Sequence, residues 1–361
     1  MDALTIEAKA SLLELAGLNE LQSLALIGMS KNAGKTTCLN HIITAWQASG
    51  QTRPLALTSI GRDGETEDIL SGRAKPRIYI PAGTLIASAE DALQRSDALL
   101  EILELSDVRT AFGEVIICRA LSDGYVELAG PGASEEIAVI SELIRQHDPE
   151  CLFIIDGALS RRSQAGSGLS EAAILAVSGI TAAVPEILAE KAAFALDLLQ
   201  ARLVTPEIQE NLMPLIISHP TARAILLSQG KHQIEHKAIE LPSLVGFGLD
   251  ISKELQKNSS ILFLRGAITD QLINELLKEP HFANLLLVVE DGTRLFLTPG
   301  TAHKLQRRKI ELAVLNALDV RLVCLNPTRS NGQLLNPEPL LAALRQKITN
   351  IPVVNLGPSN M

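Results

Sequence analysis

The apolar run Leu24–Ile27 leads directly into a loop of small residues and then into a helical pattern that begins at Lys35. The loop starts at Gly28 and ends at Gly34. A buried strand that turns through glycines into a helix directs free backbone N–H groups and the helix dipole at one point, which suits a phosphate group. This segment predicts an α/β fold of the P-loop NTPase type, with a mainly parallel sheet and helices on both faces.

Each residue type in this loop has a separate role. Gly34 lets the backbone approach a phosphate, Lys35 carries the catalytic ammonium group for the β- and γ-phosphates, and the Thr36 hydroxyl ligates Mg²⁺. The spacing departs from the common motif, because Met29 stands where the first glycine is expected and Gly28 precedes it. The candidate nucleotide contacts are Gly28, Asn32, Ala33, Gly34, Lys35, Thr36 and Thr37.

A second apolar run, Cys151–Ile155, ends in Asp156. An aspartate at the end of a buried strand is typical of the carboxylate that holds Mg²⁺ beside the loop threonine, so Thr36 and Asp156 are the candidate metal ligands. An aspartate that only ends a strand or caps the next helix gives the same pattern.

Two further segments carry candidate catalytic residues. Asp63 and Glu65 follow the apolar run Leu55–Ser59 and could orient an attacking water or complete the metal shell, although an ordinary turn with exposed acids also fits. Arg161 and Arg162 lie in a polar run after Asp156. This run fits either a mobile switch whose arginines respond to the γ-phosphate, as an arginine finger does, or a solvated loop.

The identity of the base is less constrained. No Asn/Thr-Lys-x-Asp tetrapeptide is present, which favours ATP over GTP. Asn326 leaves the run Leu322–Leu325 and could contact a base, but a turn role before Pro327 is slightly preferred.

Composition excludes several classes of protein. The 361 residues are 47% hydrophobic and 20% charged, as in a globular core, and 32 Lys and Arg against 41 Asp and Glu give a net charge of −9. This sign disfavours nucleic acid and anionic lipid as partners. Asp2, Glu7 and Glu14 interrupt the N-terminal segment, which predicts a helix rather than a signal peptide, and no apolar run reaches the ~20 residues of a membrane helix. Four scattered cysteines without a CxxC pair predict free thiols and a cytoplasmic location.

The rest of the chain alternates short apolar runs with helical patterns, which predicts two α/β domains at 1–205 and 206–361. Asp-Gly turns predict hairpins across residues 122–124 and 291–293. The predicted strands are 24–27, 55–59, 77–80, 152–155, 261–264, 285–289, 322–325 and 353–355, and the predicted helices are 35–46, 88–105, 134–147, 170–177, 185–203, 269–278 and 337–347.

One motif is interpreted as a decoy. His232, Glu235 and His236 match the H-x-x-E-H zinc-peptidase pattern, which requires a helix. Residues 231–241 alternate polar and apolar side chains as a strand does, so a peptidase is disfavoured.

The motifs together resemble the KamB-like P-loop accessory proteins, the reactivase subunits of cobalamin- and pyridoxal-phosphate-dependent lysine and ornithine aminomutases. The resemblance rests on 28–37, 58–65, 75–76, 82–84, 127–131, 155–158 with Arg161, 266–270, 291–293 and 326–327. It implies an ATP-dependent, chaperone-like role in exchanging damaged cobalamin from an inactivated aminomutase, alongside a second ATPase subunit. It carries the nucleotide site to Lys35, Thr36 and Asp156.

Two other function classes stay open. A small-molecule ligase or kinase similar to dethiobiotin synthetase would consume ATP only with its acceptor present. A non-hydrolytic nucleotide-binding module would yield no ADP at all. A homo-oligomer is compatible with each of these possibilities.

Overall fold

The computed structural model describes residues 12–60, 77–157, 170–230 and 234–357, and the chain forms two compact units. The first unit contains residues 1–195 and 319–361, and the second contains residues 196–318. This division differs from the predicted domains 1–205 and 206–361, because the chain returns to the first unit after residue 318. The reason is strand pairing: residues 320–326 add to the sheet of the first unit beside residues 173–178.

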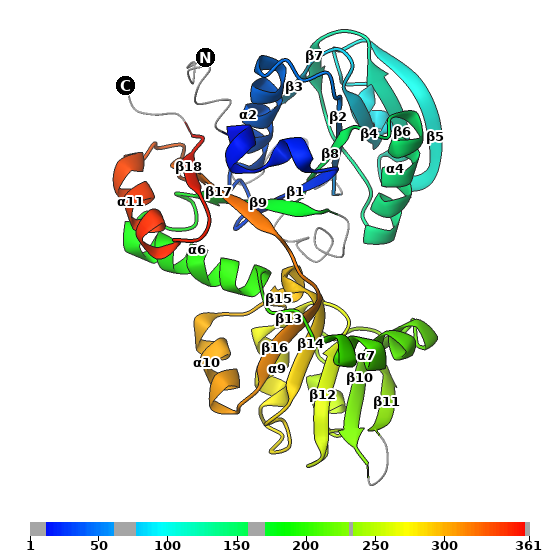
Figure 1. Ribbon diagram of the computed structural model, residues 1–361, viewed down its shortest axis with the longest axis vertical. Helices are drawn as coiled ribbons and strands as arrows, with labels where there is room; N and C mark the ends of the chain where they lie inside the picture. The colour runs from blue at the N-terminus through cyan, green and yellow to red at the C-terminus, as the bar shows by residue number, and fades with distance from the viewer. Residues whose placement is uncertain (1–11, 61–76, 158–169, 231–233, 358–361) are drawn as a thin grey trace. The chain divides into compact units, whose positions relative to one another are not determined.

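The first unit is built on a nine-stranded sheet with the order β18-β17-β9-β1-β8-β2-β4-β6-β5 (Figure 1). Neighbouring strands from β18 to β4 pair in parallel, and β6 pairs antiparallel with both β4 and β5. This mostly parallel sheet with helices confirms the predicted α/β class. The strands are β1 (Ser23–Gly28), β2 (Leu55–Ser59), β4 (Leu85–Ala89), β5 (Leu100–Thr110), β6 (Gly113–Ala120), β8 (Leu152–Asp156), β9 (Ala172–Ser178), β17 (Val320–Asn326) and β18 (Val353–Asn355).

Helices cover both faces of this sheet. Helix α2 (Lys35–Ala48) buries Leu39 and Ile42 in one core with Leu24 and Leu26, which point to the same side of β1. Ser23 points to the opposite side of β1, where it lines a cavity with residues of α4 (Ser134–His147), so α4 covers the other face. The unit also contains α3 (Glu90–Leu93), most of α6 (Pro185–Leu199), α11 (Pro337–Lys347), the 3₁₀ turn Leu18–Glu20, and a small sheet of β3 (Ile78–Ile80) with β7 (Gly124–Val126).

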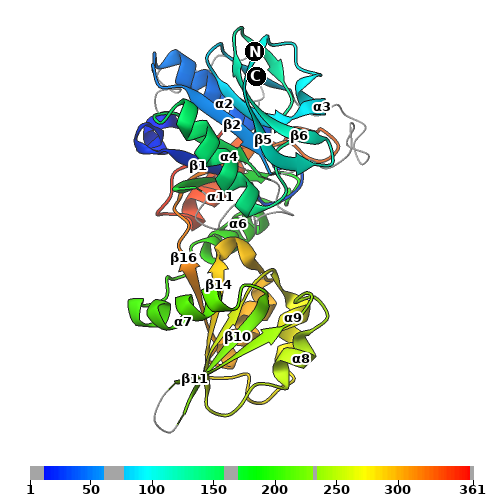
Figure 2. The same cartoon turned by 90° about the vertical axis from the view of Figure 1, so that its right-hand side faces the viewer.

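The helix predicted for residues 88–105 is wrong. The chain there completes β4, makes the short α3, and enters β5, which lies side by side with β6 at the sheet edge (Figure 2). A register shift between Ile102 and Glu104 brings Ile102 and Leu105 to the same side of the strand, where they are 62% and 61% exposed. Apolar residues three apart on one side imitate the spacing of a helix, and this explains the error.

The helix predicted for residues 170–177 is also wrong, because this segment contains β9. Every residue of β9 is buried, and the strand lies between β1 and β17. A short apolar run that is buried on both faces has no alternation, so periodicity cannot separate a strand from a helix.

Neither predicted hairpin forms. After the turn at 122–124 the chain moves to the small sheet, where β7 pairs with β3, while β6 pairs with β4 and β5. Residues 292–294 form a 3₁₀ turn, and the strand that follows pairs in parallel with residues 268–269. In both places an aspartate side chain accepts a backbone hydrogen bond: Asp123 accepts from the Ala82 N–H, and Asp291 accepts from the Thr293 N–H, each at 2.8 Å.

The second unit is a smaller α/β unit with the sheet order β11-β10-β12-β14-β16. Its core includes Leu212, Ile225, Phe263 and Val288. The elements are α7 (Pro206–Ser218), β10 (Ala222–Gln229), β11 (Ile234–Glu240), α8 (Gly248–Ser252), β12 (Ser259–Leu264), β13 (Ile268–Thr269), α9 (Asp270–Leu276), β14 (Leu286–Asp291), the 3₁₀ turn Gly292–Arg294, β15 (Leu295–Phe296), α10 (Pro299–Arg307) and β16 (Glu311–Asn316).

A buried carboxylate holds the turn that follows β14 in the second unit. Asp291 has no exposed surface, its Oδ1 accepts from the Thr293 N–H, and its Oδ2 lies 3.9 Å from Nε of Arg294. We expect Asp291→Asn to lower the free energy of unfolding by about 1–3 kcal/mol, because the amide keeps an acceptor but loses the charge beside Arg294. The control is Asp250→Asn, which alters an exposed pair with Lys253 and should cost less than about 1 kcal/mol. Equal urea midpoints for the two variants would contradict this assignment.

Within the described ranges, no helix is both long enough and apolar enough to cross a membrane. All four cysteines are free, as the sequence predicts, and all four are buried.

Candidate functional site

Five strand ends meet at one edge of the large sheet. The register pairs Leu26 of β1 with Asp156, pairs Ser59 of β2 with the same Asp156, and pairs Asn326 of β17 with Ser178 of β9. Because these strands are parallel, their carboxyl ends lie on the same side, which is where ligands bind in open α/β sheets. The β1–α2 loop, residues 29–34, leaves from the middle of this edge.

The β1–α2 loop is held in a compact conformation. Asn32 and Gly34 have φ angles of 59° and 97°, and the Ala33 N–H donates to the Ser30 carbonyl at 3.3 Å. Gly34 is the N-cap residue of α2, so no side chain caps the helix. A left-handed residue followed by a helical one turns successive N–H groups toward one point, and such a concavity accepts an anion.

Gly28 packs against the far end of the loop that follows it. A Cβ at this position would lie 3.1 Å from Cβ of Ala33 and 3.3 Å from Cγ of Lys35. The stem of Lys35 therefore packs directly over the Gly28 backbone. Asn32, in the longer loop between the two glycines, is left-handed, and Gly28 and Lys35 are in contact.

The first turn of α2 provides the polar side chains of the loop. Lys35, Thr36 and Thr37 are half-buried, whereas Lys31 in the loop is exposed. The turn contains no acidic residue that would neutralise the helix N-terminus. Ser30 is tied to Thr181 by a hydroxyl contact of 3.4 Å, so the segment after β9 supports the loop from one side.

Asp156 is half-buried at the end of β8. Backbone hydrogen bonds join this end of β8 to the ends of both neighbouring strands, β1 and β2. The Ile60 N–H donates to the Asp156 carbonyl at 2.8 Å, and the Gly157 N–H donates to the Leu26 carbonyl at 3.2 Å. The part of the chain that is described contains no group of three or more His, Cys, Asp or Glu suited to a metal. Mg²⁺ does not need such a group, because it is commonly held by one or two protein oxygens with water and phosphate oxygens.

Asn326 packs against the loop from β17. A Cβ at Gly34 would lie 2.7 Å from both Cβ and Nδ2 of Asn326. The Asn326 Oδ1 accepts from the Thr328 N–H at 3.2 Å, which is the turn role preferred from the sequence. The Asn326 side chain therefore packs against Gly34, the left-handed residue at the end of the loop. Sequence reasoning did not predict this contact.

Sequence reasoning also missed the segment that packs on β2. The Gly130 N–H donates to the Ser59 hydroxyl at 3.0 Å, and a Cβ at Gly130 would lie only 1.9 Å from the Ser59 carbonyl oxygen. Ser59 stands beside Asp156 in the register, so Gly130 lies one strand away from the candidate carboxylate. The resemblance already included residues 127–131, but the pattern of residue types gave no separate signal for them.

Four candidate residues lie outside the described residues: Asp63, Glu65, Arg161 and Arg162. His232 of the decoy motif lies outside them as well. Its companions Glu235 and His236 lie on strand β11, as the alternation of polar and apolar residues predicts.

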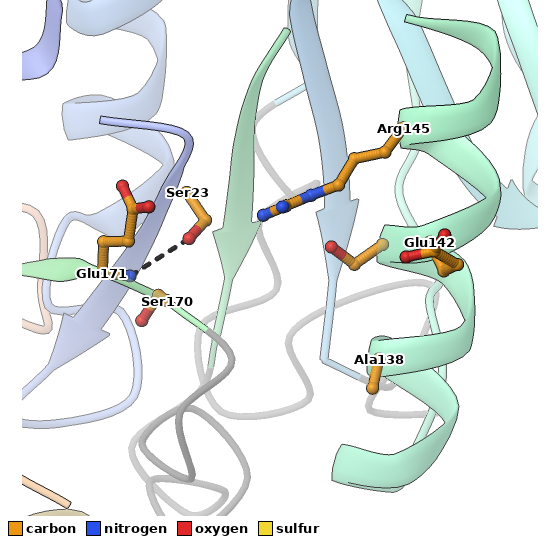
Figure 3. A pocket seen from close by; sticks show the side chains of 7 residues that line it. Ser23, Ala138, Glu142, Arg145, Ser170 and Glu171 are labelled. Atoms are coloured by element: carbon orange, nitrogen blue, oxygen red, sulfur yellow. Dashed lines mark hydrogen bonds between the residues drawn. The ribbon is translucent and has the colours of Figure 1, made fainter. Parts of the chain in front are cut away.

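A cavity of about 330 Å³ lies at the opposite edge of the same sheet (Figure 3). It is lined by the first residue of β1, by Ser170 and Glu171 before β9, and by α4. The Glu171 N–H donates to the Ser23 hydroxyl at 3.0 Å, and Arg145 donates to the Gln22 side chain at 3.1 Å. Ser23 and Gly28 are the two ends of β1, which at ~3.3 Å per residue places this cavity roughly 17 Å from the β1–α2 loop.

Comparisons with known proteins add little to the geometry of the site. No protein-family model and no curated protein matches the chain. Among solved structures, a crystal structure of pyruvate kinase from Pyrobaculum aerophilum is similar over 98% of this chain and 93% of that chain, with 11% identity and a TM-score of 0.14. A TM-score this low carries no argument about fold or function. The resemblance to the aminomutase reactivase subunits stays a prediction.

Proposed function

We propose that the first unit is a P-loop nucleotide-binding unit that binds Mg-ATP in the β1–α2 loop. The observation that carries the proposal is the left-handed Gly34, at the start of a helix that follows a central parallel strand and has Lys35 over Gly28. This combination presents backbone donors and the Lys35 ammonium group, and the first turn of α2 contains no acidic residue. An anion with several phosphate oxygens fits those donors best.

The chemistry assigned to each residue follows from its charge and place. The Lys35 ammonium group neutralises the β- and γ-phosphates, and the Thr36 hydroxyl and the Asp156 carboxylate hold Mg²⁺. Register supports the carboxylate assignment, because Asp156 ends the strand next to β1. Phosphoryl transfer needs positioned charge more than covalent catalysis. These three residues are proposed to place that charge, and Asp63 or Glu65 is the proposed group that orients water.

The biological role proposed is ATP-driven service to a partner enzyme. The resemblance described above favours a cobalamin-dependent aminomutase with a second ATPase subunit, in which nucleotide turnover would drive exchange of damaged cobalamin. The test is to add the purified protein and Mg-ATP to an inactivated aminomutase with free cobalamin. Recovery of mutase activity is expected only with Mg-ATP, and no recovery in the presence of both ATPase subunits would overturn this role.

We expect Lys35→Ala to weaken Mg-ATP binding by at least 100-fold, because it removes the cation that pairs with the phosphates. Isothermal titration calorimetry with Mg-ATP and with Mg-GTP measures the effect and the base preference together. The matched control is Lys31→Ala, which removes an exposed lysine from the same loop and should change the affinity less than about threefold.

Two outcomes would reject the nucleotide site. The first is that the native protein shows no saturable heat with either nucleotide. The second is that Lys35→Ala binds Mg-ATP as tightly as the native chain while keeping its circular dichroism spectrum.

A further inference from the structure

Two cysteines far apart in sequence meet inside the first unit. The Cys38 thiol donates to Sγ of Cys324 with a sulfur–sulfur distance of 3.5 Å. Their side chains are 1% and 3% exposed, and both thiols are free. Cys118 and Cys151 are also buried and free, and neither contacts another thiol in the part of the chain that is described.

The thiol pair joins the two segments that form the β1–α2 loop contact. Cys38 lies in the first turn of α2, where its N–H donates to the Gly34 carbonyl at 2.9 Å. Cys324 lies in β17 two residues before Asn326, whose side chain packs on Gly34. The start of α2 and the end of β17 therefore touch twice, once through the thiols and once through Gly34 and Asn326.

We propose that Cys38 and Cys324 are an oxidative modification site. A hydroperoxide forms a disulfide between them, and this disulfide prevents the β1–α2 loop from binding nucleotide. One thiol loses its proton and attacks a peroxide oxygen, the O–O bond breaks, and a sulfenic acid and one water form. The second thiol then attacks that sulfur, the S–OH bond breaks, and the S–S bond forms with release of a second water. Both cysteines are oxidised and one hydrogen peroxide is reduced to two waters. The effect on nucleotide rests on the proposed function, whereas the disulfide itself does not.

The change in distance explains why such a bond would alter the loop. A disulfide holds its sulfurs at ~2.05 Å, so the two sulfurs must approach by about 1.5 Å. The strand is the more rigid partner, because β17 is paired on both sides by β9 and β18. We therefore expect the first turn of α2 to move, and a shift of that size displaces Lys35 and Thr36 from a phosphate.

Burial sets the rate of this modification. Desolvation raises the pKa of the Cys324 thiol well above its usual range, and the neighbouring Cys38 thiol raises it further. A protonated thiol is a poor nucleophile, so oxidation is expected to be slow and to require opening of the loop. Bound Mg-ATP would hold the loop closed and protect the pair.

The experiment treats the full chain with hydrogen peroxide, with and without Mg-ATP, blocks remaining thiols with N-ethylmaleimide, and identifies the peptides by mass spectrometry. We expect a peptide that links Cys38 to Cys324, formed at least fivefold more slowly with Mg-ATP. Oxidised protein should bind Mg-ATP at least tenfold more weakly, and dithiothreitol should restore the affinity. Cys118 and Cys151 are the internal controls: burial raises the pKa of each to about 11, and both should be recovered as alkylated thiols only after unfolding.

Cys324→Ala and Cys38→Ala provide the matched variants. Each should bind Mg-ATP as the native chain does and keep that affinity after peroxide. Absence of the linked peptide, or a linked protein with unchanged affinity, overturns the proposal. If the reduced native chain does not bind Mg-ATP at all, the proposed function fails, and the linked peptide still decides whether the thiol pair is oxidised.

Discussion

Replacing Gly130 by alanine is expected to lower the free energy of unfolding of the first unit by about 3 kcal/mol. The added Cβ would lie 1.9 Å from the Ser59 carbonyl oxygen and 2.6 Å from the Thr58 hydroxyl oxygen. No flexible side chain can give way there, because Thr58 is fully buried, its hydroxyl donates to the Ala87 carbonyl at 2.8 Å, and β2 is paired with β8 and β4. The backbone at 130 must move away from β2 and lose its hydrogen bond to Ser59.

The control for this variant stands two residues further on. Gly132 is exposed and has no atom within 4 Å of the position of an added Cβ, so Gly132→Ala should change stability by less than about 0.5 kcal/mol. Urea unfolding followed by circular dichroism compares the two. Similar midpoints for both variants would show that residues 127–131 do not pack on β2 as described.

Replacing Gly34 by alanine is expected to cost about 2–3 kcal/mol of stability and to abolish binding of Mg-ATP in calorimetry. The φ of 97° is a left-handed conformation that an L side chain adopts at a cost of about 1–2 kcal/mol. The added Cβ would also lie 2.7 Å from Cβ of Asn326, so strand and loop must separate. Both effects displace the first turn of α2, which holds Lys35 and Thr36.

Gly50→Ala separates conformational strain from crowding. Gly50 follows α2 with a φ of 69°, and no atom lies within 4 Å of the position of an added Cβ. This variant should cost only the strain of about 1 kcal/mol and should bind Mg-ATP normally. If Gly34→Ala binds Mg-ATP as tightly as Gly50→Ala does, the loop is not the nucleotide site.

Local sequence signals were sufficient for the elements with strong periodicity and clear ends. The predicted strand 55–59 and the predicted helices 134–147 and 337–347 match the structure residue for residue. The helix that begins at Lys35 was also predicted, because Gly34 marks its start and a buried run precedes it. In each case the residues that end the element are its own neighbours in sequence, so no distant contact is needed to define it.

The candidate site was predicted only in part, because some of its contacts join segments that are distant in sequence. Gly28, Lys35 and Thr36 belong to one continuous segment, and Asp156 ends a run of buried residues, so residue type and spacing revealed them. Asn326 was named as a possible base contact, yet its packing on Gly34 depends on β17 joining this sheet. Gly130 gave no signal, because its close approach to Ser59 exists only once two segments more than 70 residues apart are folded together.

The sequence by itself determined the α/β class, the strand–loop–helix at residues 24–37 and the free thiols, because these follow from local periodicity, glycine placement and cysteine spacing. The tertiary structure alone decided that residues 319–357 return to the first unit, that residues 172–178 form a strand, and that β6 and β7 enter different sheets. Those choices depend on which strand edge buries more apolar surface and satisfies more backbone hydrogen bonds. Both quantities depend on contacts between segments distant in sequence, so no local sequence pattern predicts the strand pairing.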